Sequence, residues 1–176
     1  MTLRFPVFAF FLQKQYLIYN LSYQSTKKHE YYYCLASPKM DIPKKTTLTS
    51  HKITIIPRYC ETDQAGVVHH TVYPIWLEMG RTELLRQNGL PYSKLEKMGT
   101  FFVVAEINVR YRRPAYYDEQ LELETTVTKV TSARVEHSYC LKRKSTGLLL
   151  AEAKTTLACV DSDGSLKKIP DFMCLE

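Results

Sequence analysis

One helical pattern followed by four strand patterns constrains the fold of this chain more than any other feature. Apolar residues recur at helical spacing between Tyr73 and Leu85. Four later segments alternate apolar and polar residues with the period of two that is typical of half-buried strands. These segments are residues 105–112, 121–128, 135–142 and 148–160, and a further strand is expected before the helix at 51–59.

The ends of the helix are also marked in the sequence. Thr71 fits an N-cap, Pro74 fits the first turn, and Gly89 fits the stop. Residues 90–98 suggest a short second helix. The order of elements predicts an α+β fold in which a curved antiparallel β-sheet wraps around one long central helix. Because one helix covers only one face of the sheet, we expect a homodimer.

Residues 1–39 differ from the rest of the chain. They contain five Lys and Arg but one acidic residue, so they carry most of the formal net charge of +6. Their apolar residues follow neither period, and the run at 5–12 is too short to span a bilayer. We interpret 1–39 as a disordered extension or a mis-annotated start, with translation beginning at Met40. The domain is then 40–176, and neither nucleic-acid binding nor stable membrane insertion is expected of it.

The cysteines point away from metal and redox chemistry. The five cysteines form no CxxC pair and have no histidine at zinc-finger spacing, so we expect reduced thiols in a cytoplasmic protein. Cys60 is expected to pack as a small hydrophobe. The adjacent His69 and His70 point in different directions on a helix and have no third ligand nearby in the sequence. No metal site and no cofactor are therefore expected.

The candidate chemistry lies between Arg58 and Arg81. Asp63 is expected at the end of the first strand, Gly66 permits a tight turn, and His70 stands where the helix begins. A carboxylate that faces a helix N-terminus can attack a carbonyl or activate water, while helix amides stabilise the oxyanion. The alternative is that Asp63 only forms an Asx-turn or a cap.

Two further residues of this stretch are candidates. Tyr59 would share one face of an extended chain with Asp63. Glu78 is expected to be buried near the site, because its neighbours are apolar. Glu78 can also form a helical ion pair with Arg81, three residues later.

A basic group on a later strand is a candidate phosphate site. Arg110 and Arg112 share one strand face, where they could meet the phosphates of a nucleotide-bearing thiol. Residues 142–144 offer a second basic group. For both groups, a solvated strand face is the alternative.

The residues from Tyr59 to Arg81, YCETDQAGVVHHTVYPIWLEMGR, resemble the signature of the hotdog-fold 4-hydroxybenzoyl-CoA thioesterase family. They are most similar to its short-chain acyl-CoA branch, which is linked to the Tol–Pal envelope system. The run VRYRRPAYYDE, residues 109–119, is similar to a second block, and the resemblance covers about 52–172. The matching positions are Thr62, Asp63, Gly66, Val67, Val68, His70, Tyr73, Trp76, Glu78 and Arg81.

The resemblance implies a hotdog thioesterase that hydrolyses a small acyl-CoA or an acyl-carrier-protein thioester. It implies that Asp63 is the nucleophile or general base and that His70 supplies an amide and an imidazole. It also implies that Tyr59 lies near the reaction centre and that Gly66, Val67 and Val68 line the substrate. Coenzyme A is then part of the substrate and not a cofactor.

The resemblance also bears on assembly and on rival functions. Sites of this family form at a dimer interface, and dimers commonly pair into homotetramers. Residues 71–72 replace the small polar pair usual in the family, which bears on acyl-chain preference. The motifs of hotdog dehydratases are absent from the sequence. A non-catalytic acyl-CoA-binding or envelope-associated interaction module remains the alternative function.

Overall fold

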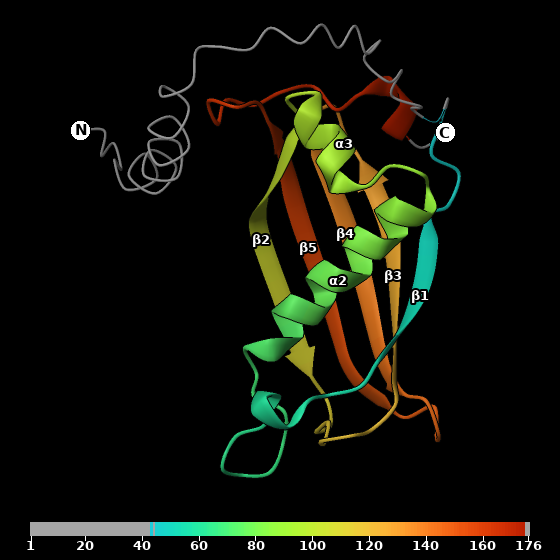
Figure 1. Ribbon diagram of the computed structural model, residues 1–176, viewed down its shortest axis with the longest axis vertical. Helices are drawn as coiled ribbons and strands as arrows, with labels where there is room; N and C mark the ends of the chain where they lie inside the picture. Colours follow the sequence, from blue (N-terminus) through green and yellow to red (C-terminus); the bar gives the residue numbers. More distant parts are fainter. Residues whose placement is uncertain (1–42, 44, 175–176) are drawn as a thin grey trace, which may run out of the picture. The chain divides into compact units, whose positions relative to one another are not determined.

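The computed structural model describes residue 43 and residues 45–174, and therefore most of the predicted domain (Figure 1). The expected extension, 1–39, lies outside the described residues. The elements are β1 (Ser50–Ile55), η1 (Tyr59–Glu61), α2 (Val72–Gln87), α3 (Tyr92–Lys97), β2 (Phe101–Tyr111), β3 (Leu121–Val130), β4 (Arg134–Arg143), β5 (Leu149–Val160) and η2 (Asp171–Met173).

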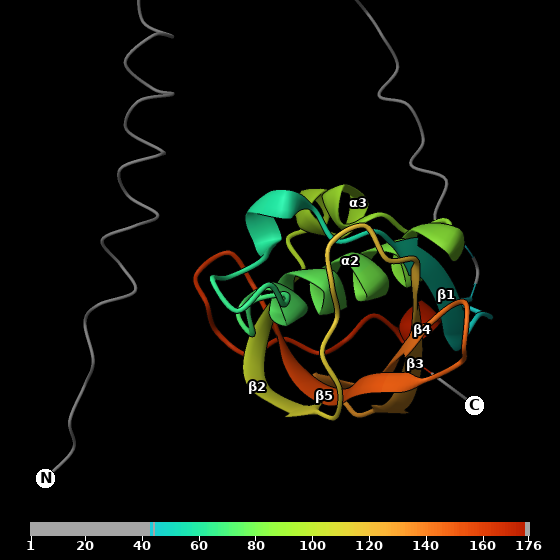
Figure 2. The ribbon, with the colours of Figure 1, turned by 90° about the horizontal axis from the view of Figure 1, so that it is seen from below.

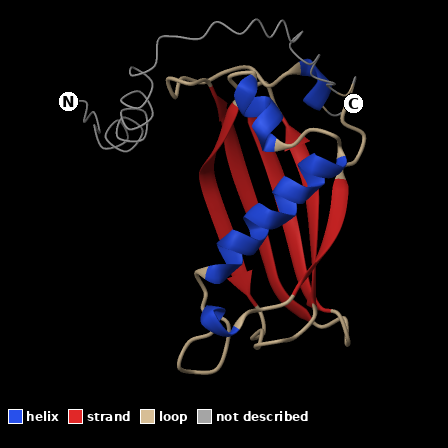
Figure 3. Cartoon of the chain, in the orientation of Figure 1, coloured by secondary structure: helices blue, strands red, loops and turns tan. Residues whose placement is uncertain are grey.

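The strands form one antiparallel sheet (Figure 3). Their order is β1-β3-β4-β5-β2 (Figure 1). Figure 2 shows this sheet curving around α2, so the expected α+β hotdog arrangement is confirmed. β5 lies between β4 and β2, which explains why its sequence is the longest and most apolar strand pattern. No described helix is long and apolar enough to cross a membrane.

α2 packs closely on the sheet through the apolar face that its sequence predicts. Its buried residues include Tyr73, Trp76 and Leu84. At Gly80 an added Cβ would lie 2.3 Å from Thr125 Oγ1 on β3, so only glycine allows this close approach. The helix ends at the expected place, where Gly89 follows the C-cap with φ +72°.

The structure differs from the sequence prediction at the two ends of the segment between β1 and α2. β1 ends at Ile55 and not at Tyr59, because Pro57 has no N–H to donate to a neighbouring strand. Thr71 occupies the N-cap position, but its side chain makes no capping hydrogen bond. Its hydroxyl lies 2.8 Å from His69 Nδ1 instead.

β2 is a long edge strand with apolar residues on its surface. Val103, Val104, Ile107 and Tyr111 are all exposed, and the outer edge of β2 is not paired within the described residues. Unpaired edges of this length are usually covered in the native assembly. The homodimer stays a prediction, and β2 is the surface on which it would form.

Candidate active site

Residues 61–69 form a small hairpin immediately before α2, and Asp63 lies at the start of its loop. His69 N donates to Glu61 O at 2.9 Å, and Asp63 N donates to Val67 O at 2.9 Å. These two bonds hold the chain in a tight reversal. The carboxylate of Asp63 is therefore carried on a fixed backbone and not on an open loop.

Gly66 and Val68 fix the hairpin in opposite ways. Gly66 has φ +75° and open space around its Cα, so the backbone conformation alone explains the glycine. Val68 is buried, pairs with Thr62 across the hairpin, and donates its N–H to Ala115 O at 2.9 Å. Gly66 thus permits the tight turn at the tip of the hairpin, and Val68 holds its base in place.

The carboxylate of Asp63 is only half used by the protein. Its Oδ1 accepts a hydrogen bond from Ala65 N at 2.8 Å, which is the Asx-turn that the sequence left open as an alternative. Oδ2 accepts no hydrogen bond from any described residue, and the side chain is exposed. The Asx-turn orients the carboxylate and leaves one oxygen available to a substrate or a water molecule.

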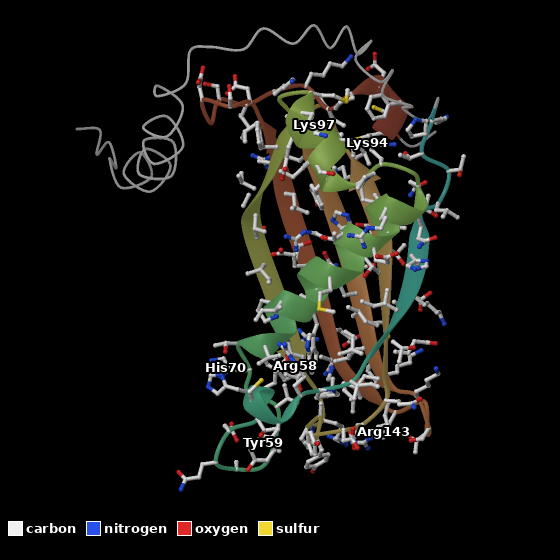
Figure 4. The ribbon with its side chains drawn as sticks, in the orientation of Figure 1. Arg58, Tyr59, His70, Lys94, Lys97 and Arg143 are labelled. Carbon is white, nitrogen blue, oxygen red and sulfur yellow. The ribbon has the colours of Figure 1, made fainter. Side chains whose placement is uncertain are left out.

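His70 presents an unused backbone donor next to this carboxylate loop. Its N–H donates to no other atom of the described residues, while its carbonyl accepts from Tyr111 Oη at 3.0 Å. α2 begins two residues later, so the N–H lies at the positive end of the helix. The exposed His70 ring lies 4.2 Å from that of His69. Figure 4 shows His70 and Tyr59 together at this end of the molecule.

Glu61 anchors the hairpin to the helix, a role that the sequence did not reveal. Its buried carboxylate accepts from Arg58 N at 2.8 Å and from the Arg58 guanidinium at 2.8 Å. Burial pushes the pKa of Glu61 up, but hydrogen bonds from Arg58 and Trp76 outweigh it and hold the pKa below its ordinary value. Glu61 is thus charged and ties the start of the hairpin to α2.

Tyr59 does not share an extended face with Asp63, which corrects the expectation from strand spacing. It opens the 3-10 turn η1, and its side chain is 79% exposed. Its ring meets that of Tyr117 edge to face, with 5.7 Å between centroids. Tyr111 and Tyr117 both belong to the second sequence block, residues 109–119. The sequence did not show which residues of the first block they contact.

Glu78 is exposed, so the expectation that it is buried near the site is wrong. Its side chain is 68% exposed and contacts Arg81, whose Nη2 lies 3.4 Å from Glu78 Oε2. The predicted helical ion pair is therefore confirmed. The apolar neighbours in sequence do not bury Glu78, because Trp76 and Leu77 face the sheet while Met79 is itself exposed.

Arg110 and Arg112 lie on the outer face of β2 and its continuation. Residues of this parity face away from Tyr111, whose hydroxyl reaches His70. Arg112 forms an ion pair with Glu152 at 2.8 Å. In the second basic group, Arg143 forms an ion pair with Glu119 at 3.0 Å. Within the described residues no hydrogen bond or ion pair joins either group to Asp63.

Cys60 is exposed beside the site, so the expected packed thiol is wrong. It occupies the middle of η1, whose outer side faces solvent. The four described cysteines are all free thiols. Across residues 45–174 no three His, Cys, Asp or Glu side chains are grouped as metal ligands would be.

Known proteins share both the sequence and this fold. Residues 58–175 match the thioesterase-like superfamily. The acyl-CoA thioesterase YbgC of Haemophilus influenzae is 36% identical over 112 residues, 63% of this chain and 80% of that protein. The Escherichia coli acyl-CoA thioester hydrolase YbgC is 33% identical over 103 residues, 58% of this chain and 76% of that protein. The DHNA-CoA thioesterase structure of Staphylococcus aureus has TM-score 0.64 and 31% identity, covering 68% of this chain and 79% of that one.

These matches agree with the resemblance seen in the sequence. The family match spans the hairpin, α2 and the four following strands. None of the names mentions an envelope system, so the Tol–Pal link stays a prediction. The matched region covers about two thirds of the chain and includes the candidate residues from Tyr59 to Arg112. This protein belongs to the thioesterase-like superfamily of hotdog-fold thioester hydrolases.

Proposed function

We propose that this protein hydrolyses the thioester of a small acyl-CoA to a free acid and CoA, with Asp63 as the reacting carboxylate. The observation that carries the proposal is that the Asp63 hairpin, which leads into α2, holds a free carboxylate oxygen and is followed by an unused His70 N–H at the helix start. The names of the YbgC relatives support acyl-CoA as the substrate class.

The reaction needs a base or nucleophile and an oxyanion donor. Asp63 takes a proton from water as the water oxygen attacks the thioester carbon, or Asp63 attacks directly and forms an anhydride that water then cleaves. In both routes the C–S bond breaks and the thiolate of CoA leaves and is protonated. The His70 N–H binds the carbonyl oxygen as it gains negative charge, an interaction that typically contributes about 3–4 kcal/mol.

The remaining site residues support this centre in the proposal. Gly66, Val67 and Val68 shape the loop against which the acyl thioester lies. The His70 imidazole and the Tyr59 hydroxyl lie at the same end of the molecule and assist positioning. Arg110 and Arg112 contact the phosphates of a CoA that lies across β2, which fits the pairing of β2 edges in a homodimer that assembles further into a homotetramer.

Substitution Asp63→Asn tests the proposal. We expect release of free CoA thiol from acetyl-CoA, butyryl-CoA and benzoyl-CoA to fall by roughly 100-fold or more, with an unchanged unfolding transition. The matched control is Asp163→Asn, which alters an exposed carboxylate in the turn after β5. Near-normal turnover by Asp63→Asn would remove Asp63 from the reaction.

The same assay addresses the alternative function. A non-catalytic acyl-CoA-binding module would bind acyl-CoA in a titration and release no thiol from any of the three substrates. A single turnover in ¹⁸O-water distinguishes the two routes. Label in the Asp63 carboxylate shows an anhydride that water cleaved at the Asp63 carbonyl. Label in the product acid alone fits direct attack by water and also attack of water on the acyl carbon of an anhydride, so hydroxylamine trapping of the acyl group separates these two cases.

A further inference from the structure

A layer of polar side chains lies in the middle of the core, away from the Asp63 hairpin. Thr125, His137 and Thr155 are all buried on neighbouring strands β3, β4 and β5, on the face that packs against α2. Arg81 projects from α2 toward this layer, since Arg81 and His137 line one cavity. Apolar side chains at these positions would avoid the free-energy cost of burying polar groups.

The charge of Arg81 is poorly compensated by the protein. Its side chain is 10% exposed, while its one described carboxylate partner, Glu78, is 68% exposed and 3.4 Å away. Such a partner is largely screened by solvent. Tyr92 lines the same cavity as Arg81, but its hydroxyl carries no charge. A buried guanidinium in this position needs an anion.

Hydrogen-bonding capacity is also left over here. Five buried side-chain nitrogen or oxygen atoms have no hydrogen-bond partner within the described residues. Three of them belong to this layer: Arg81 Nε, Thr125 Oγ1 and His137 Nδ1. Unpartnered buried polar atoms are uncommon and costly, so this cluster favours a polar ligand nearby. Arg81 and His137 line the adjoining cavity, whereas Thr125 does not.

A cavity of about 50 Å³ adjoins the layer. Arg81, His137 and Tyr92 supply its polar lining, and the rest is mostly apolar. A water molecule needs about 10–15 Å³ of such space, so the cavity holds a few waters or a short acid of about two to four carbons. The apolar lining includes Leu84, Phe102, Val127, Val135 and Leu157.

The rim of the cavity is held in place by a short strap before β1. Thr47 N and Leu48 N both donate to Asn88 Oδ1, at 3.0 and 2.9 Å, and Asn88 Nδ2 donates back to Leu48 O at 3.0 Å. Thr46 N donates to Phe172 O at 2.8 Å. The cavity is therefore a defined feature of the fold, bordered by segments from both ends of the domain.

We propose that this cavity binds a short-chain aliphatic monocarboxylate, with its carboxylate on Arg81, Tyr92 and His137 and its alkyl chain along the apolar lining. The carboxylate accepts a hydrogen bond from Arg81 Nε and compensates the positive charge of Arg81. A water molecule can accept the same hydrogen bond but carries no compensating charge. Arg81 lies nine residues after Val72, so it is about 14 Å along α2 from the start of the helix. The site is thus separate from the Asp63 hairpin and does not depend on the proposed thioesterase activity.

Titration of the full chain with butyrate, without any CoA compound, tests the proposal. We expect saturable binding by calorimetry, together with a shift of the His137 imidazole resonances in NMR spectra. Butyramide, which has the same shape but no charge, and equal concentrations of chloride should give neither response. Equal responses to butyramide or chloride would overturn the proposal, as would a His137 signal that stays fixed while butyrate binds.

Variants locate the binding on the polar lining. Arg81→Gln should weaken butyrate binding by about tenfold or more, and Tyr92→Phe, which keeps the charge and the ring, by about threefold. The matched control is Arg86→Gln on the same helix, where the arginine is exposed and paired with Glu83. If Arg81→Gln does not fold, the Tyr92→Phe result decides. Unchanged affinity in either folded variant would contradict the assignment.

Discussion

The start and the middle of α2 carry polar groups in opposite settings. At its start, the Asp63 hairpin is exposed, and its reactive atoms are left free by a backbone that satisfies itself. Near its middle, Arg81 and His137 are buried, and their unpartnered atoms are held by the packing of helix on sheet. The exposed groups are available at little cost to folding. The buried groups are costly to folding, so their presence in the core supports the binding of a polar ligand there.

After Asp63→Asn, the largest effect should come from straining the exposed hairpin. Gly66→Val places a β-branched side chain at φ +75°, which such residues rarely adopt, so the loop must rearrange. We expect kcat for acyl-CoA hydrolysis to fall by about 100-fold, since a displacement of about 1 Å at a reacting group has that effect.

Gly147→Val is the matched control for this change. Gly147 has φ +69° and open surroundings in the turn between β4 and β5. We expect both variants to lose about 1–2 kcal/mol of unfolding free energy. If both also lost activity equally, the hairpin would have no special role in catalysis.

For the buried layer, the expected effect is on the pH dependence of folding stability and not on catalytic activity. Burial, with a further contribution from Arg81, lowers the pKa of His137 to about 4. The unfolded chain has a histidine pKa near ~6.5 and so binds a proton that the folded chain does not between those values. Stability is fully present above pH ~6.5 and falls as the pH drops toward 4. We expect His137 to account for about 2 kcal/mol of lost stability at pH 5.

Urea unfolding at pH 7.5 and 5.0 measures this effect. His137→Gln should show a smaller loss between the two pH values than the wild type, by about the same 2 kcal/mol. Equal losses in the two proteins would mean that His137 is not buried as a neutral side chain. Glu61, whose pKa is lowered, contributes in both proteins and cancels in the difference.

A smaller effect is expected where the helix meets the sheet. In Gly80→Ala the new Cβ would lie 2.3 Å from Thr125 Oγ1 and 2.9 Å from Leu123 Cδ2, so the helix or these side chains must shift. The clash outweighs the better helix propensity of alanine, and we expect a net loss of about 1–2 kcal/mol by denaturant unfolding. An increase in stability would show that Thr125 has room to move.

The smallest effects separate the two regions most directly. Tyr111→Phe removes the hydroxyl that binds His70 O at 3.0 Å, and Tyr139→Phe removes the one that lies 2.9 Å from Thr155 Oγ1. Each should cost about 1 kcal/mol of stability. Only Tyr111→Phe should lower kcat, by about fivefold, because it alone orients the His70 backbone. A matching loss of kcat in Tyr139→Phe would show that the regions are coupled.

Several features of the site could be read from the sequence and several could not. The period of the helix, the stop at Gly89 and the strand alternation were sufficient for the fold. The same period did not show that Glu78 is exposed, because apolar neighbours along the chain do not determine which side of a helix is covered. Spacing also placed Tyr59 and Asp63 on one strand face, whereas Pro57 ends β1 and a 3-10 turn follows.

The sequence by itself determined the hotdog order of elements, the family and the Asp63–His70 stretch, because these depend on local periodicity and on residues close together in the chain. Only the tertiary structure decided that Asp63 keeps one free oxygen and that Tyr111 supports His70. It alone brought Arg81, Tyr92 and His137 to one cavity. Those residues come from α2, α3 and β4, and side chains so far apart in sequence meet only when the helix packs on the sheet.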